Sequence, residues 1–291
     1  MTTATGQNKP LYKAREMEEL LDVWFYHPLG YRFALLGRQL RLTADQITYI
    51  SMLLGMAGGL MLAWPALIWW GYALIIFSSV LDSADGQLAR LTGTGTERGR
   101  ILDGMIGYVT YLFAYLSLCV LYLKNPMRPH GAAYIFGLAV AAGVCTAVQS
   151  SMYDFYRTTF AAVVSRGRAA LHDEDKNLPV FFRFCYSGYH VYQKFFAASH
   201  LALMKKLNGR FPSGALPDGV RGQYRAANRK TVRGWNILGD NTRFIALAAA
   251  LWLGRPEHYF LFIICALSVV MSVMIHLQRE ADATLAQTLK D

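Results

Sequence analysis

Long apolar runs separated by basic segments are the feature that most constrains how this chain can fold. A helix needs about 20 apolar residues to cross a bilayer core of about 30 Å. Of the 291 residues, 54% are hydrophobic and only 16% are charged, whereas soluble domains usually carry about 25% charged residues. We therefore predict an all-α integral membrane protein with six transmembrane helices, at residues 46–64, 67–90, 100–123, 131–160, 240–254 and 257–276.

Composition shifts divide the chain into four predicted segments. Residues 1–41 form a cytoplasmic segment whose Leu20, Leu21, Trp24 and Phe25 share one helix side, which predicts an amphipathic helix at the membrane surface. The alternative is a soluble helix packed on the main domain. The other predicted segments are 42–160, with four spans; 161–239, a basic and aromatic insert at the cytoplasmic surface or interface; and 240–291, with two spans and a tail.

Basic residues predict the orientation and the partners. Lys and Arg are concentrated in the N-terminal segment, in the turn at 91–99 and in the insert, and the net charge is +10. By the positive-inside rule, both termini of this multi-pass protein are cytoplasmic, in a bacterial inner membrane or its equivalent. On a membrane protein such an excess of cations faces cytoplasm and anionic lipid, so we expect no nucleic-acid partner. Within the insert, four Gly and two Pro between Asn208 and Gly222 predict a loop.

Three aspartates lie where apolar spans meet the cytoplasmic side. Asp82 and Asp85 are three residues apart near the end of the second predicted span, so they share one helix face. Asp103 follows near the start of the third predicted span. Ionisable residues in such segments are rare and mark functional sites by default. A short turn folds the two helices antiparallel, so we expect the three carboxylates to converge.

This convergence predicts a metal-held phosphate or pyrophosphate at the membrane surface. At about 4 Å and an effective dielectric constant of about 20, each pair of carboxylates repels by about 4 kcal/mol, so the groups share protons or hold a cation. Oxygen ligands favour Mg²⁺ or Mn²⁺. The alternative is that the carboxylates cap helix ends and the glycines serve close helix packing. The small residues Gly86, Ala89 and Gly99 leave room for a ligand. Arg90 and Arg100 supply positive charge for phosphates.

The same residues resemble the signature of the CDP-alcohol phosphotransferase (CDP-alcohol phosphatidyltransferase) family. The chain matches seven of its eight fixed positions in the order Asp82-x2-Asp85-Gly86-x2-Ala89-Arg90-x8-Gly99-x3-Asp103. The resemblance covers roughly residues 15–160 and 235–276 and leaves out the basic insert.

The resemblance implies a six-helix membrane enzyme, usually a homodimer, that acts in phospholipid biosynthesis. Such enzymes transfer a substituted phosphate from a CDP-linked donor to an alcohol acceptor and release CMP. By position, Asp82, Asp85 and Asp103 would hold two ions of Mg²⁺ or Mn²⁺, with Asp103 and Arg90 as catalytic residues. The nucleotide-binding residues would be Gly86, Ala89, Gly99 and Arg90.

The eighth position of the signature departs from the family. The family has Asp four residues after its third Asp, and Gly107 stands at that place. A metal ligand and a candidate general base are lost together, and a general base commonly contributes about 10²–10⁴-fold. Three alternatives stay open. Glu97, Asp154 or a metal-bound hydroxide takes the proton; the chain is an impaired relative that binds CDP-lipid or metal or acts as a scaffold; or the glycine was introduced to trap a complex.

The acceptor pocket is the least constrained part of the predicted site. Asp154 and Arg157, near the end of the fourth predicted span, and Arg100 are candidates for it. The alternative for Asp154 and Arg157 is an interfacial ion pair within an aromatic belt. The signature does not distinguish CDP-diacylglycerol from a CDP-linked small alcohol as the donor, and it does not specify the acceptor. A small transporter is the remaining alternative to an enzyme or a binding protein.

Overall fold

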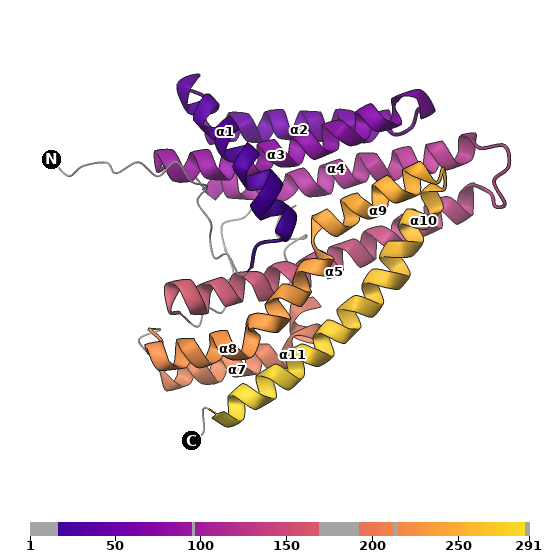
Figure 1. Ribbon diagram of the computed structural model, residues 1–291. Coiled ribbons are helices and arrows are strands. Elements are labelled where there is room, and N and C mark those ends of the chain that lie inside the picture. Colours follow the sequence, from indigo (N-terminus) through magenta and orange to yellow (C-terminus); the bar gives the residue numbers. More distant parts are fainter. Residues whose placement is uncertain (1–16, 95–96, 169–191, 212–214, 289–291) are drawn as a thin grey trace. The chain divides into compact units, whose positions relative to one another are not determined.

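The chain is helical throughout the part that the structure describes. Figure 1 shows the computed structural model, which describes residues 17–94, 97–168, 192–211 and 215–288, with the backbone alone for 97–106 and 166. Within these ranges there is no strand, and one antiparallel bridge joins Arg168 to Ala215. The predicted all-α class is confirmed. The helices, in chain order, are η1 (Asp22–Tyr26), α1 (His27–Gln39), α2 (Ala44–Met61), η2 (Pro65–Leu67), α3 (Ile68–Thr92), α4 (Glu97–Lys124), α5 (Ala132–Arg166), α7 (Ala198–Arg210), α8 (Asp218–Trp235), η3 (Asn236–Leu238), α9 (Asp240–Trp252), α10 (Pro256–Leu261), η4 (Phe262–Leu267) and α11 (Ser268–Thr288).

Among the residues that the structure describes, four helical segments are long and apolar enough to cross a membrane, so the chain is a multi-pass membrane protein. They are Pro65–Thr92, Gly107–Lys124, Ala132–Ser165 and Pro256–Thr288, and they match four of the six predicted spans. The other two predicted spans, 46–64 and 240–254, fall on α2 and α9. Helix α2 begins with polar residues and α9 has only 13 residues, so six spans and a surface-bound N-terminal helix stay predictions.

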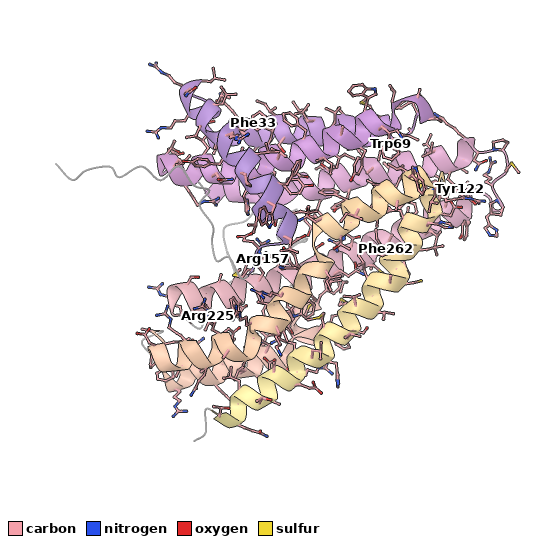
Figure 2. All side chains as sticks on the ribbon, viewed as in Figure 1. Phe33, Trp69, Tyr122, Arg157, Arg225 and Phe262 are labelled. Carbon is pink, nitrogen blue, oxygen red and sulfur yellow. The ribbon has the colours of Figure 1, made fainter. Side chains whose placement is uncertain are left out.

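The chain divides into two compact units. Unit 1 contains Leu20–Ala139 and Phe244–Tyr259, and unit 2 contains the described parts of Lys13–Glu19, Val140–Arg243 and Phe260–Asp291. In unit 1, α2, α3 and α4 lie side by side and α1 packs on α3 (Figure 1). Large apolar side chains such as Trp69 at the start of α3 remain on its surface (Figure 2), as expected for helices in contact with lipid.

Helix α2 begins with a capping box formed by Thr43 and Gln46. The backbone N–H of Gln46 donates to Thr43 Oγ1 at 3.2 Å, and the backbone N–H of Thr43 donates to Gln46 Oε1 at 2.9 Å. Each side chain thus satisfies an N–H group that the first helical turn leaves without a partner. The capping box therefore gives α2 a well-defined start.

Small and hydroxyl residues fix the register of α2 against α3. An added Cβ at Gly58 would lie 2.7 Å from the carbonyl oxygen of Gly71, so the two backbones are in contact. Two turns along, Ser51 Oγ donates to the carbonyl oxygen of Ser78 and Ser78 Oγ donates to that of Ser51, both at 2.8 Å. These contacts leave little freedom for α3 to slide or turn on α2.

Unit 2 is a helix bundle that contains most of the predicted 161–239 insert. Helices α7 and α8 pack on α11 around a core that includes Phe160 and Val163 of α5, Leu203 of α7 and Leu285 of α11. Helix α5 has 35 residues and is about 50 Å long at 1.5 Å per residue, so it extends beyond a 30 Å bilayer core. The later parts of α5 and α11 therefore have amphipathic partners instead of lipid.

The loop predicted between Asn208 and Gly222 is shorter than expected. Helix α7 continues to Arg210 and α8 already begins at Asp218. Glycine costs about 1 kcal/mol in a helix interior, but burial of Tyr224 and Trp235 on the inner face of α8 outweighs that cost.

A polar layer crosses the interior of unit 2. His200 Nδ1 lies 2.7 Å from Asp282 Oδ1, and Tyr224 Oη lies 3.1 Å from His200 Nε2. Gln278 Nε2 donates to Asn228 Oδ1 at 2.6 Å and to Asp282 Oδ1 at 3.0 Å. Burial, together with the Asp282 carboxylate, raises the pKa of the Tyr224 hydroxyl well above its usual value. The layer joins α7, α8 and α11 through hydrogen bonds rather than apolar contacts alone.

Candidate active site

Helix α3 carries the first two aspartates of the motif on one face. Asp82 and Asp85 are separated by three residues within this continuous helix, as the sequence predicts. Asp85 is 3% exposed and Asp82 is half-buried. Two carboxylates on adjacent turns therefore point out of α3 in similar directions.

A threonine of α2 holds the Asp85 carboxylate. Thr48 Oγ1 donates to Asp85 Oδ2 at 2.6 Å, and both residues are buried. Hydrogen bonds to an ionised carboxylate are shorter and stronger than neutral ones, and a buried charge without such partners is costly. Thr48 thus orients one carboxylate oxygen of Asp85. Thr48 lies outside the motif, and no sequence pattern singles it out.

The small and basic positions of the motif follow on the same helix. A Cβ at Gly86 would lie 3.6 Å from Nη1 of Arg90, so the guanidinium folds back over the position where Gly86 has no side chain. Asp82, Gly86 and Arg90 are spaced by four residues and form one ridge of α3. Ala89 is half-buried beside them. The Arg90 guanidinium is thus one to two helical turns from the Asp82 and Asp85 carboxylates, where its positive charge would pair with a phosphate.

Helix α4 supplies the other motif positions. Gly93, with a φ of +68°, ends α3 in the left-handed conformation that favours glycine, and α4 begins at Glu97. Asp103 therefore lies in the second turn of α4. The side chains of Asp103, Glu97 and Arg100 lie outside the described residues, as do the surroundings of Gly99. The convergence of Asp103 with Asp82 and Asp85 therefore stays a prediction.

Gly107 leaves open space at the missing motif position. It lies on α4 one turn after Asp103, and no atom lies within 4 Å of an added Cβ. A side chain at this position would meet no steric obstacle among the described residues.

The candidate acceptor residues on α5 differ in their surroundings. Arg157, labelled in Figure 2, donates from Nη2 to Glu18 Oε2 at 2.5 Å and from Nη1 to Tyr153 Oη at 2.6 Å. Tyr153 in turn donates to Glu19 Oε1 at 3.0 Å. Asp154 is exposed on another face of α5. Arg157 is thus paired with a buried glutamate that the sequence analysis did not single out, and the acceptor role of Arg157 and Asp154 stays a prediction.

The donor set of α3 fits a divalent cation. Asp82 and Asp85 supply carboxylate oxygens only, the ligands preferred by Mg²⁺ and Mn²⁺. Thr48 donates a hydrogen bond to Asp85, and hydrogen bonds of this kind from residues outside the ligand set orient metal ligands. These two residues suit the metal that the predicted chemistry needs.

The comparison with protein families identifies the class of this membrane protein. The family model for CDP-alcohol phosphatidyltransferase matches residues 41–193, which is more than half of the chain and includes every motif position described above. The chain belongs to the CDP-alcohol phosphatidyltransferase family. Comparisons with curated proteins and with solved structures gave no match.

Membership in this family supports a CDP-alcohol phosphotransferase role in phospholipid synthesis. The family is generally dependent on divalent metal ions. Its substrates are CDP-linked alcohols and alcohol acceptors, handled among membrane lipids. The apolar helices agree with that setting.

Proposed function

We propose that this protein transfers a substituted phosphate from a CDP-linked donor to an alcohol acceptor at the cytoplasmic membrane surface, with release of CMP. The observation that carries the proposal is the Asp82–Asp85 pair on α3, with Asp85 buried and hydrogen-bonded to Thr48. The pair stands in a family signature that has seven matching positions.

Each motif residue has a proposed task. Asp82, Asp85 and Asp103 would hold two divalent ions, Mg²⁺ or Mn²⁺. When bound, these cations neutralise the donor pyrophosphate and the charge that grows on the departing CMP. Thr48 keeps Asp85 oriented, and Arg90 supplies further positive charge to the phosphates. Gly86, Ala89 and Gly99 flank the cytidine, where a larger side chain would block the approach of the nucleotide.

The transfer step is an in-line displacement at phosphorus. The acceptor oxygen forms a bond to the β-phosphorus while the bond from that phosphorus to the CMP oxygen breaks, and the acceptor hydroxyl loses its proton. Catalysis rests mainly on positioning and electrostatic stabilisation. Gly107 cannot accept the proton of the alcohol. The candidate proton acceptors within this chain are therefore Glu97 and Asp154. Arg100 and Arg157 are candidates for binding the acceptor alcohol.

We also propose six spans with both termini in the cytoplasm of a bacterial cell or its equivalent. Helix α2 supports this arrangement, because Tyr49, Ile50, Leu53 and Leu60 leave large apolar surfaces exposed, as lipid contact requires. Helix α9 would be the fifth span. The family resemblance favours a homodimer, and the mass of the detergent-solubilised protein by light scattering tests that state.

The enzymatic assignment is tested by CMP release from purified protein. The assay contains Mn²⁺ or Mg²⁺, either CDP-diacylglycerol or CDP-linked small alcohols, and a panel of acceptor alcohols. We expect Asp85→Ala to abolish CMP release. The matched control is Asp218→Ala, the same change on the exposed start of α8, where the side chain is 94% exposed. Undiminished turnover by Asp85→Ala would refute the assignment.

A second candidate function is donor binding without turnover, and Gly107 is the observation that favours it. Because a Cβ at this position meets no atom within 4 Å, Gly107→Asp restores the family carboxylate without a clash. If the site lacks only this group, CMP release rises by about 10²–10⁴-fold, the usual contribution of a general base. Donor binding without CMP release by either form would favour the binding role.

A further inference from the structure

We propose that His27 of α1 is a positioning residue for the turn of α3 that carries Asp82 and Asp85. The proposal rests on the proposed function, because it assigns a task toward the same carboxylates. His27 Nδ1 lies 2.9 Å from Ser83 Oγ, and Ser83 directly follows Asp82. The ring therefore contacts α3 between the two motif aspartates, from a helix that the motif does not include.

A second hydrogen bond joins His27 to α3, one turn further along that helix. Gln87, which is 1% exposed, donates from Nε2 to the carbonyl oxygen of His27 at 3.0 Å and to Ser83 Oγ at 3.2 Å. His27 is thus bound through its ring and through its backbone. The three residues form a closed hydrogen-bonded group that spans one turn of α3.

Gly30 brings α1 against the α3 backbone at the same place. A Cβ at Gly30 would lie 2.8 Å from Ser83 Oγ and 3.1 Å from the backbone nitrogen of Ala84. Ala34, one turn later on α1, continues the contact in an apolar cluster with Ala84 and other residues of α2 and α3. This close approach removes the space in which α1 and α3 could otherwise rotate past each other.

The hydrogen bonds from Thr48 and from His27 reach different sides of α3. Thr48 of α2 restrains Asp85, and His27 of α1 restrains Ser83, which is about 160° from Asp85 around a helix with 3.6 residues per turn. A helix held on two sides keeps its rotation about its own axis. A rotation of about 10° moves a carboxylate several ångströms from the axis by about 1 Å, and a misplacement of 1 Å in an active site can cost about 10²-fold in rate.

The test compares His27→Leu with His27→Asn in the full-length protein in detergent. Leucine keeps the bulk of the ring but cannot bind Ser83, whereas the asparagine amide reaches about as far as Nδ1 does. Electron paramagnetic resonance measures Mn²⁺ binding, and the CMP assay measures kcat and KM. We expect His27→Leu to weaken Mn²⁺ binding by about 10–100-fold, the usual effect of losing an outer partner of a metal ligand. His27→Asn should restore binding close to that of the unmodified protein.

The matched control is His276→Leu, because this histidine has an exposed side chain on α11 and its loss should change neither Mn²⁺ binding nor kcat. If His27→Leu does not fold, Ser83→Ala breaks the same bond from α3 and should show the same loss.

Unchanged Mn²⁺ affinity in the folded His27→Leu or Ser83→Ala protein would overturn the inference and leave the proposed function standing. A His27→Asn protein as impaired as His27→Leu would also overturn it, because the ring would then act on metal or substrate directly. If the unmodified protein neither binds Mn²⁺ nor releases CMP, the proposed function fails and this inference fails with it.

Discussion

At the scale of single residues, the site depends on a carboxylate that is both buried and oriented. Asp85 is 3% exposed, so it has lost most of its contact with water. A buried carboxylate is tolerated only with hydrogen-bond partners or a bound cation. Thr48 provides one such partner at 2.6 Å, and its role can be separated from that of the motif itself.

We predict that Thr48→Val reduces metal-dependent CMP release by about 10–100-fold, because valine has nearly the same shape but cannot donate to Asp85. The Mn²⁺ concentration for half-maximal activity should rise as well. The check is a Mn²⁺ titration of CMP release.

Thr48→Ser is the matched control for this prediction. Serine retains the hydroxyl group and should keep most of the activity. Equal activity in the valine and serine proteins would show that the hydrogen bond has no function.

The sequence predicts the shared face of Asp82 and Asp85, but it does not predict which residues of other helices bind this part of α3. Asp82 and Asp85 share a face because they are three residues apart in one helix, and this much follows from the sequence alone. Thr48 and His27 are 37 and 56 residues away from the α3 residues they bind. No periodicity links such distant positions, so these partners emerge only when the helices are packed together.

At the scale of helices, the contact of α2 with α3 depends on two glycines. A Cβ at Gly71 would lie 2.6 Å from the carbonyl oxygen of Gly58, and neither backbone can yield without separating the helices. The contact therefore controls how close the Thr48 and Asp85 side chains come.

We predict that Gly71→Ala destabilises the protein by about 1–3 kcal/mol, the usual cost of forcing an extra group into a well-packed contact. Its thermal unfolding midpoint in detergent should fall. Gly137→Ala is the control, because no atom lies within 4 Å of a Cβ there, and it should leave the midpoint unchanged or raise it. Equal midpoints for the two variants would contradict the predicted role of the contact.

A second prediction at this scale concerns the polar layer of unit 2. His200→Leu removes the 2.7 Å hydrogen-bond partner of the buried Asp282 carboxylate, and leaving a buried polar group without its partner usually costs about 1–3 kcal/mol. We expect a lower unfolding midpoint and faster proteolysis of α7 and α8.

The double variant His200→Leu/Asp282→Leu tests the cause of that loss. It should recover much of the stability, because no buried carboxylate is then left without its histidine partner. A double variant less stable than His200→Leu alone would contradict this explanation.

The spans illustrate which helices can be predicted from a sequence. The runs at 67–90, 131–160 and 257–276 each contain a long apolar stretch, and each matches a helix. Their ends were harder to predict: α5 continues to Arg166 and α11 to Thr288. These extensions are amphipathic and are stabilised by packing on α7 and α8, which hydropathy alone does not reveal.

At the scale of the whole molecule, the number of spans determines which ends share a side of the membrane. If α2 and α9 both cross the bilayer, the chain between α1 and α2 lies on the same side as the end of α3. If only the four clearly apolar segments cross, these two places lie on opposite sides.

We predict that single cysteines at Gln39 and Thr94 are labelled from the same side of the membrane, and that one at Met127 is labelled from the other. All three positions are exposed. The measurement uses an impermeant thiol reagent on oriented membranes, in a protein without its four native cysteines. Labelling of Gln39 and Thr94 from opposite sides would contradict the six-span arrangement.

Mn²⁺ binding tests whether three aspartates from α3 and α4 form one metal site. Paramagnetic resonance on the purified protein, compared with Asp82→Asn, Asp85→Asn and Asp103→Asn, needs no knowledge of the acceptor alcohol. We predict that each substitution weakens Mn²⁺ binding by at least about tenfold, because each removes one charged ligand of the same site. Unchanged Mn²⁺ affinity in the Asp103→Asn protein would contradict a site shared between the two helices.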